Sequence, residues 1–81
     1  MKFKGYEVFK SDKPEKKYFA IVRGKKVYFG DTAYEHFFDK LGIWSSLNHN
    51  DPERRRLYLA RTASQKKIPG TAAWFAREVL W

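Results

Sequence analysis

The stretch from Lys17 to Phe29 reads KYFAIVRGKKVYF, two runs of β-forming residues around a turn that contains glycine. The first run extends to Arg23, and the second begins at Lys26. The connection Arg23-Gly24-Lys25 is short enough for an antiparallel turn with Gly24 at positive φ. This stretch therefore predicts a β-hairpin, around which the rest of the domain is built.

A third strand is predicted upstream, from Phe3 to Phe9, separated from the hairpin by the turn-like sequence Ser11-Asp12-Lys13-Pro14. Together the three strands form an antiparallel meander. Alternate positions then define two faces. The predicted core face holds Phe19, Ile21, Val27 and Phe29.

The opposite face is predicted to combine tyrosines with a lysine: Tyr18, Ala20, Val22, Lys26 and Tyr28, joined by Tyr6 if Gly5 permits a bulge. Aromatic rings beside cations form platforms on which unpaired bases stack. This face is therefore a candidate for binding single strands. The alternative is that the last helix covers it, so that its tyrosines belong to the core.

Three helices are predicted downstream. In the first, which begins at Asp31 and stops at Gly42, Thr32 and Glu35 form a capping box ahead of an apolar stripe. Residues 43–50 form a loop anchored by Trp44. Residues 51–63 form the second helix, and 72–80 form the third, a core helix capped by Thr71. The stripe of the first helix comprises Tyr34, Phe37, Phe38 and Leu41.

The second helix begins with Asp51 as its cap and Pro52 as its first residue. At 100° per residue its inward side is predicted to hold Leu57, Leu59, Ala60 and Ala63, and its other side Arg54, Arg55, Tyr58 and Thr62. Arg56 falls within the apolar arc, where it is expected to pair with a carboxylate.

The chain is thus expected to be one α+β domain over residues 1–81, with a β-meander in 1–30 and a helical part in 31–81. Its 81 residues include no cysteine, which excludes a disulfide scaffold and thiolate zinc sites. No apolar run is long enough to span a membrane, and the start lacks the apolar segment of a signal peptide. Neither membrane insertion nor secretion by a signal peptide is expected.

Charge points to a polyanionic partner, because the chain carries a net charge of +8. Residues 1–30 contribute +6 and residues 51–67 contribute +4, with a segment of −2 between them. Arginine and lysine side chains contact phosphates. The alternative is a solvated surface that keeps a small protein in solution. The predicted nucleic-acid contacts are Arg54, Arg55, Tyr58, Arg61, Lys66 and Lys67 on the helix and its linker, and Lys26 and Tyr28 on the sheet.

An enzyme is not expected, because no phosphate-binding loop, nucleophile elbow or cysteine nucleophile is present. The two histidines lie near acids, His36 beside Glu35 and Asp39, and His49 beside Asp51. This spacing does not bring three ligands together on one helix face, so solvated surface roles are expected for both histidines. No metal or cofactor is predicted.

Three motifs in this order carry a resemblance: KKVYFGD at 25–31, HNDPERRRLYLAR at 49–61, and a segment from Pro69-Gly70 to Leu80-Trp81. They resemble a family of small, uncharacterised proteins of large DNA viruses, including nucleocytoplasmic giant viruses and some large phages. The shared patterns are K-K-x-x-F-G, H-x-D-P-E-R and P-G…L-W. The resemblance implies a viral protein that acts in the virion or inside the host cell.

Charge and resemblance together predict a viral nucleic-acid-binding protein with mainly phosphate contacts, weak sequence specificity and duplex DNA as its expected target. One alternative is a structural, capsid-associated protein that acts through contacts with other virion proteins. Another is a small inhibitor of a host enzyme. The sequence leaves the oligomeric state open.

Overall fold

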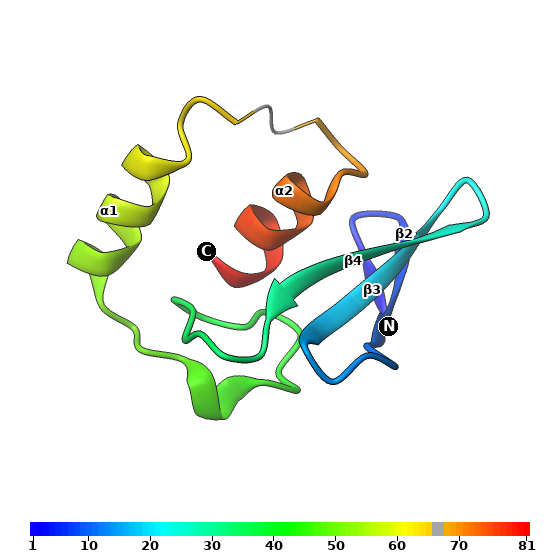
Figure 1. Ribbon diagram of the computed structural model, residues 1–81, viewed down its shortest axis with the longest axis horizontal. Helices are drawn as coiled ribbons and strands as arrows, with labels where there is room; N and C mark the ends of the chain where they lie inside the picture. Colours follow the sequence, from blue (N-terminus) through cyan, green and yellow to red (C-terminus); the bar gives the residue numbers. More distant parts are fainter. Residues whose placement is uncertain (66–67) are drawn as a thin grey trace.

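The computed structural model describes residues 1–65 and 68–81, which form an α+β domain built on one antiparallel sheet (Figure 1). The sheet has the order β1-β2-β3-β4. Its strands are β1 (Lys2–Phe3), β2 (Tyr6–Lys10), β3 (Lys16–Val22) and β4 (Lys25–Asp31). The helices are α1 (Pro52–Arg61) and α2 (Ala72–Phe75), with a 3₁₀ turn η1 (Ser45–Leu47) and a π-helical turn η2 (Ala76–Leu80) that continues α2. In these two ranges no helix is long and apolar enough to cross a membrane.

The predicted first strand is in fact two strands. Phe3 pairs with Tyr6 across a two-residue turn, in which Lys4 has φ 48° and Gly5 has φ 89°. Two successive residues at positive φ are typical of the tight hairpin turn that matches the twist of β-strands. The chain therefore turns back at Gly5 instead of forming a bulge, and the sheet has four strands where three were predicted.

The β3–β4 hairpin is confirmed, but its loop is one residue shorter than predicted. Val22 pairs with Lys25, so only Arg23 and Gly24 lie in the turn, with φ 52° and 78°. In a hairpin the loop length fixes which residues face each other, and a change of one residue moves one strand's side chains to the opposite face.

The predicted faces of β3 are therefore exchanged. Tyr18 lies opposite Phe29, and Ala20 lies opposite Val27, on the core side of the sheet. Phe19 was predicted to be in the core but lies on the other side, opposite Tyr28. The core face also holds Val8 from β2, which pairs with Ala20.

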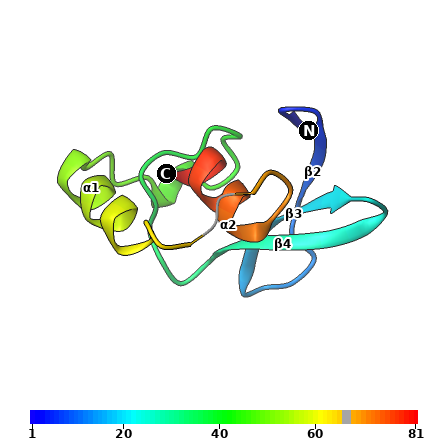
Figure 2. The same ribbon diagram turned by 90° about the horizontal axis from the view of Figure 1, so that it is seen from above.

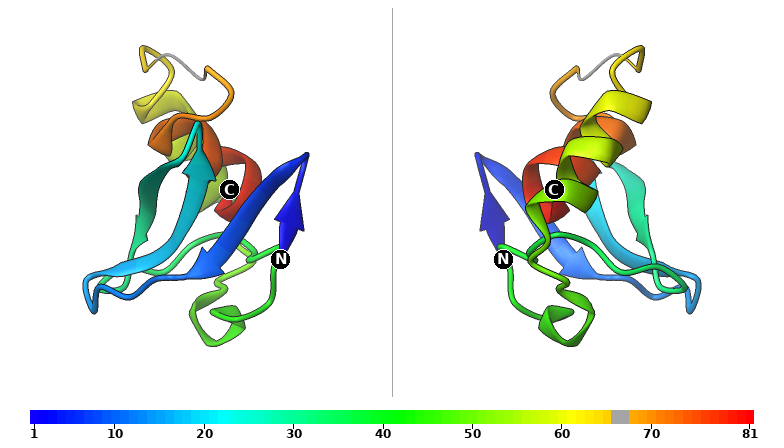
Figure 3. Two further views of the ribbon diagram at one scale, coloured as in Figure 1. Left: turned by 90° about the vertical axis from the view of Figure 1, so that its right-hand side faces the viewer. Right: turned by 90° about the vertical axis from the view of Figure 1, so that its left-hand side faces the viewer.

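The last helix covers the core face of the sheet, as the two views in Figure 3 show. Phe75 stacks on Phe29 with 5.2 Å between ring centroids. The Thr71 side chain accepts a hydrogen bond from the Trp74 amide, which confirms the predicted cap. The buried hydrophobic residues are Val8, Tyr18, Ala20, Phe29, Phe75, Val79 and Leu80.

The prediction of a helix from Asp31 to Gly42 is wrong. Residues 32–44 form turns and extended backbone, and the 3₁₀ turn η1 follows. Tyr34 and Phe38, two members of the predicted apolar stripe, are 68% and 48% exposed. The predicted anchoring of the loop by Trp44 is confirmed, because its indole Nε1 donates a hydrogen bond to the Lys17 carbonyl oxygen at 2.9 Å.

Helix α1 lies at the opposite end of the molecule from the sheet (Figures 1 and 2). Its predicted inward side is wrong: Leu57 is 51% exposed, while Tyr58 is half-buried and Thr62 is buried. Arg56 is exposed and pairs with Glu53 on the helix surface. With only two α-helices in the described ranges, the predicted count of three is also wrong.

Asp51 caps α1, as predicted. Its Oδ1 accepts a hydrogen bond from the Glu53 amide at 3.0 Å, and Pro52 occupies the first turn. Replacing Asp51 by alanine is expected to lower the free energy of unfolding by about 1 kcal/mol, because it leaves helix amides without an acceptor. Urea denaturation of Asp51→Ala and Asp51→Asn measures this. Asparagine is also a good cap, so its variant should keep most of the stability, and equal losses for both would contradict the capping role.

Candidate nucleic-acid interface

Three aromatic rings from adjacent strands lie in a row on the face of the sheet that α2 does not cover. Phe9 of β2 stacks on Phe19 of β3 with 5.3 Å between centroids and 28° between ring planes. Phe19 in turn lies 5.5 Å from Tyr28 of β4. Phe9 is 42% exposed, and the other two rings are partly exposed. We call Phe9, Phe19 and Tyr28 the ring row.

Two lysines lie over the ring row. The ammonium of Lys26 is 4.8 Å from the Phe19 centroid, and that of Lys13 is 4.3 Å from the Tyr28 centroid. A cation over an aromatic face is attracted by the ring's π-electrons. The ring row therefore combines partly exposed aromatic rings with two cations beside them.

One carboxylate shares this surface. Asp12 accepts hydrogen bonds from the Tyr28 hydroxyl at 2.6 Å and from the Lys26 ammonium at 3.1 Å. The bond from Tyr28, followed by that from Lys26, lowers the pKa of Asp12, and its carboxylate raises the pKa of both partners. The two oxygens of one carboxylate are thus held by a phenol and an ammonium, which shows that these two donors can hold one acceptor group together.

The sequence predicted Lys26 and Tyr28 at this surface but missed Phe9, Phe19 and Lys13. Phe19 was missed because the loop was predicted one residue too long. The two-residue loop Arg23-Gly24 sets the register of β3 against β4, and this register places Phe19 opposite Tyr28. The predicted tyrosine partners of this face lie elsewhere. Tyr18 is in the core, and Tyr6 packs edge-on against Phe75 with 5.1 Å between centroids.

The arginines of α1 were predicted to contact phosphates, but two of them have partners inside the protein. Arg54 Nη1 lies 2.8 Å from a Glu35 carboxylate oxygen, and Arg55 Nε donates to the Trp81 carbonyl oxygen at 2.6 Å. Arg61 lies over the Tyr58 ring at 5.7 Å. Lys66 and Lys67 lie outside the described residues.

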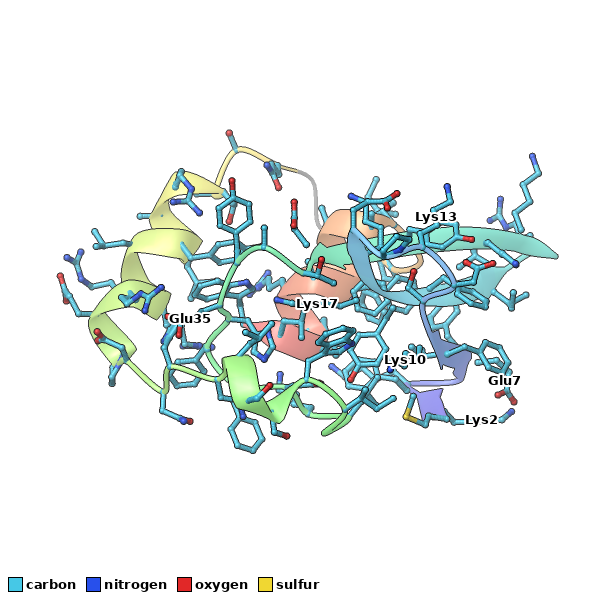
Figure 4. The ribbon with its side chains drawn as sticks, turned by 60° about the horizontal axis from the view of Figure 1, so that its bottom comes forward. Lys2, Glu7, Lys10, Lys13, Lys17 and Glu35 are labelled. Carbon is cyan, nitrogen blue, oxygen red and sulfur yellow. The ribbon has the colours of Figure 1, made fainter. Side chains whose placement is uncertain are left out.

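Arg54, Tyr58 and Arg61 do come together, along a cleft of about 300 Å³. Tyr58 stacks on Trp81 in this cleft, with 4.1 Å between centroids and 9° between planes. Figure 4 shows Glu35, which also lines the cleft, at the α1 end and Lys13 at the sheet end. The predicted contacts thus form two separate surfaces, one on α1 and one on the sheet.

A buried polar network begins at Lys17, which points into the interior of the protein in Figure 4. Its ammonium donates to the Tyr34 carbonyl oxygen at 2.7 Å and to His36 Nδ1 at 2.8 Å. Because Nδ1 accepts, the neutral His36 ring carries its proton on Nε2, which donates to Asn48 Oδ1 at 2.6 Å. Burial lowers the pKa of Lys17.

Asp39 forms the other half of this network. Its carboxylate accepts from the Tyr18 hydroxyl at 2.5 Å, the Trp44 amide at 2.8 Å and the Leu41 amide at 2.9 Å. The chief cause of the raised pKa of Tyr18 is burial, with the bond to Asp39 second. These bonds satisfy loop amides that a helix would have paired along its own backbone. The network therefore holds residues 34–48 against the sheet.

The prediction that both histidines are solvated is wrong: His36 is fully buried, and His49 is partly buried, with its Nε2 atom out of contact with solvent. Among residues 1–65 and 68–81, no three histidine or acidic side chains form a group that could hold a metal ion. Both ring nitrogens of His36 are hydrogen-bonded within the protein, to Lys17 and to Asn48, so its role is to position the loop.

The buried histidine makes stability depend on pH. Burial, and secondly the Lys17 charge, lowers the pKa of His36, and burial lowers that of His49. The unfolded chain then binds a proton more readily than the folded one, so the free energy of unfolding should fall as pH drops below about 6.5. Thermal melts between pH 7.5 and 5.5 measure this fall. His36→Gln should flatten it more than His49→Gln, and an unchanged slope in His36→Gln would contradict the assignment.

Comparison of the chain with protein-family models, curated proteins and solved structures found no match. The resemblance to a viral family therefore stays a prediction from the three motifs, as do a viral setting and a place in the virion.

Proposed function

We propose that this protein binds single-stranded nucleic acid on the open face of its sheet, with bases stacked on the ring row. The observation that supports this most directly is the alignment of Phe9, Phe19 and Tyr28 across three adjacent strands. One lysine ammonium lies over the Phe19 ring and another lies over the Tyr28 ring. Aromatic rings beside cations are the recurrent means by which sheets bind unpaired bases.

Single strands suit this surface better than the duplex expected from the sequence. In a duplex the base faces are covered by their neighbours, so flat exposed rings find no partner there. The duplex prediction relied on the arginines of α1, of which Arg54 and Arg55 are engaged within the protein. On the sheet, Lys26 is paired with Asp12, but Lys13 has no ion pair within the described residues and lies beside the rings, where the backbone of a stacked strand would pass.

Electrostatics adds affinity without sequence preference. The net charge of +8 attracts a polyanion, and Lys13 and Lys26 lie close enough to the ring row to reach phosphates. With two or three phosphates neutralised, log affinity should fall with log salt at a slope of about −1.5 to −2 for a single strand. Binding is therefore expected to be weakly sequence-specific and moderately sensitive to salt.

Anisotropy titrations with a labelled 12-nucleotide single strand and the matching duplex, at two salt concentrations, test the proposal. The single strand should bind more tightly, and Phe9→Ser should weaken its binding about 5- to 150-fold, since each stacked base contributes about 1 to 3 kcal/mol. Phe9 is 42% exposed, so this change should cost little stability. Tyr34→Ser is the matched control, because it removes another exposed ring at the α1 end.

A second pair of variants separates the two surfaces. Lys13→Gln with Lys26→Gln should weaken binding and reduce the salt slope, whereas Arg61→Gln should leave both nearly unchanged. The opposite pattern, with tighter duplex binding, would place the interface on α1. If no nucleic acid binds, the proposal fails and a protein-binding role becomes the better explanation.

A further inference from the structure

A second binding site is suggested by the cleft at the α1 end, which does not include the ring row. The cleft of about 300 Å³ adjoins a hollow of about 210 Å³. Five residues line both: Tyr34, Glu35, Tyr58, Arg61 and Trp81. The combined space is at the lower end of the size range of small-molecule sites.

Aromatic side chains form much of the lining. Tyr34 is 68% exposed, and the Tyr58 and Trp81 rings are stacked almost parallel, with 9° between their planes. An exposed ring and a stacked pair on the same cleft provide flat surfaces for a planar ring, which stacks favourably on aromatic faces.

The charges in the cleft are arranged unevenly. Of the two arginines in the cleft, Arg61 has no ion pair within the described residues, whereas Arg54 is paired with Glu35 through one Nη atom. The adjoining hollow is lined by Lys17 and Asp31. The Lys17 ammonium has three N–H bonds but two acceptors within the described part of the chain. An anionic group therefore suits Arg61, and a ring edge with both donors and acceptors suits Lys17 and Asp31.

We propose that this cleft binds a mononucleotide, with its base against Tyr34, Tyr58 and Trp81 and its phosphate at Arg61. The polar edge of the base faces the hollow that holds Lys17 and Asp31. This site shares no residue with the ring row, so it goes beyond the proposed function and does not depend on it.

Calorimetric titration with the four nucleoside 5′-monophosphates, their nucleosides and inorganic phosphate tests the site. A monophosphate should bind one-to-one and more tightly than its nucleoside or phosphate alone. Arg61→Gln should weaken it about tenfold or more, because the charge-assisted hydrogen bond to the phosphate is lost. Arg23→Gln, at the exposed tip of the β3–β4 hairpin, removes the same charge and should change nothing.

Two ring variants distinguish this site from the sheet. Tyr34→Ser should weaken the mononucleotide and spare the single strand, and Phe9→Ser should do the reverse. If Phe9→Ser abolishes mononucleotide binding, the nucleotide occupies the ring row and the cleft proposal is wrong, although single-strand binding stands. Absence of binding at millimolar concentration, an Arg61→Gln variant that binds normally, or equal affinity for inorganic phosphate would each overturn the cleft proposal.

Discussion

Replacing Asp39 by alanine is expected to lower the free energy of unfolding by about 3 to 5 kcal/mol, a large part of the margin of a small domain. The carboxylate is buried and accepts hydrogen bonds from the Tyr18 hydroxyl and from the amides of Leu41 and Trp44. Removing it leaves three donors without a partner in the interior, and each unsatisfied buried donor costs about 1 to 3 kcal/mol.

Urea denaturation followed by tryptophan fluorescence measures the loss. Asp12→Ala is the matched control, since Asp12 also accepts from a tyrosine hydroxyl but is exposed, and it should cost far less than Asp39→Ala. Tyr18→Phe removes one donor and leaves the two amides bonded, so its cost should fall between the two. Equal stability of Asp39→Ala and Asp12→Ala would show that the network does not hold the loop.

The second large effect is expected at Gly30, where alanine should cost about 2 to 4 kcal/mol through backbone strain and overpacking together. Gly30 has φ 78°, and a Cβ atom there would lie 2.9 Å from Leu80 Cδ1 and 3.1 Å from Lys17 Cβ. Leu80 and Lys17 are both buried, so neither can move aside freely.

Gly24→Ala provides an internal control for this prediction. Gly24 also has φ 78°, but nothing lies within 4 Å of its Cβ position. It should cost only the backbone strain, about 1 to 2 kcal/mol. The difference between the two variants in denaturant midpoints then isolates the contact with Leu80 and Lys17. If the two variants are equally stable, the close packing of β4 against η2 is contradicted.

Features that depend on a few neighbouring residues could be predicted from the sequence. Asp51 and Thr71 cap helices because their side-chain oxygens reach amides two or three residues away, and nothing distant is needed. The positive φ of Gly24 follows in the same way from the turn itself. The last helix was also recognised, since its apolar residues are dense enough to require burial.

Features that depend on distant contacts could not be predicted. The stripe over residues 34–41 has helical spacing, but two intervening polar side chains, His36 and Asp39, are buried by bonds to Lys17 and Tyr18. Those partners are 19 and 21 residues away, so no local pattern reveals them. Likewise, the sequence RGK fits a two-residue or a three-residue loop equally well. This difference of one residue in loop length decides which face of the sheet every β3 side chain occupies.

The candidate site was predicted in part for the same reason. Lys26 and Tyr28 were placed on an aromatic face, but the wrong loop length paired them with Tyr18 instead of Phe19. On α1, charge alone suggested a phosphate surface. The charge pattern could not show that Arg54 pairs with Glu35 or that Arg55 donates to the Trp81 carbonyl oxygen, because both partners lie outside that helix.

The most direct test of single-strand binding on the sheet is an NMR titration of the labelled protein with an unlabelled 12-nucleotide single strand. The largest shift changes are expected in the ring protons of Phe9, Phe19 and Tyr28 and in the side chains of Lys13 and Lys26, because stacked bases shield the nuclei that they cover. Changes confined to residues 54–61 of α1, with the ring row unaffected, would contradict it.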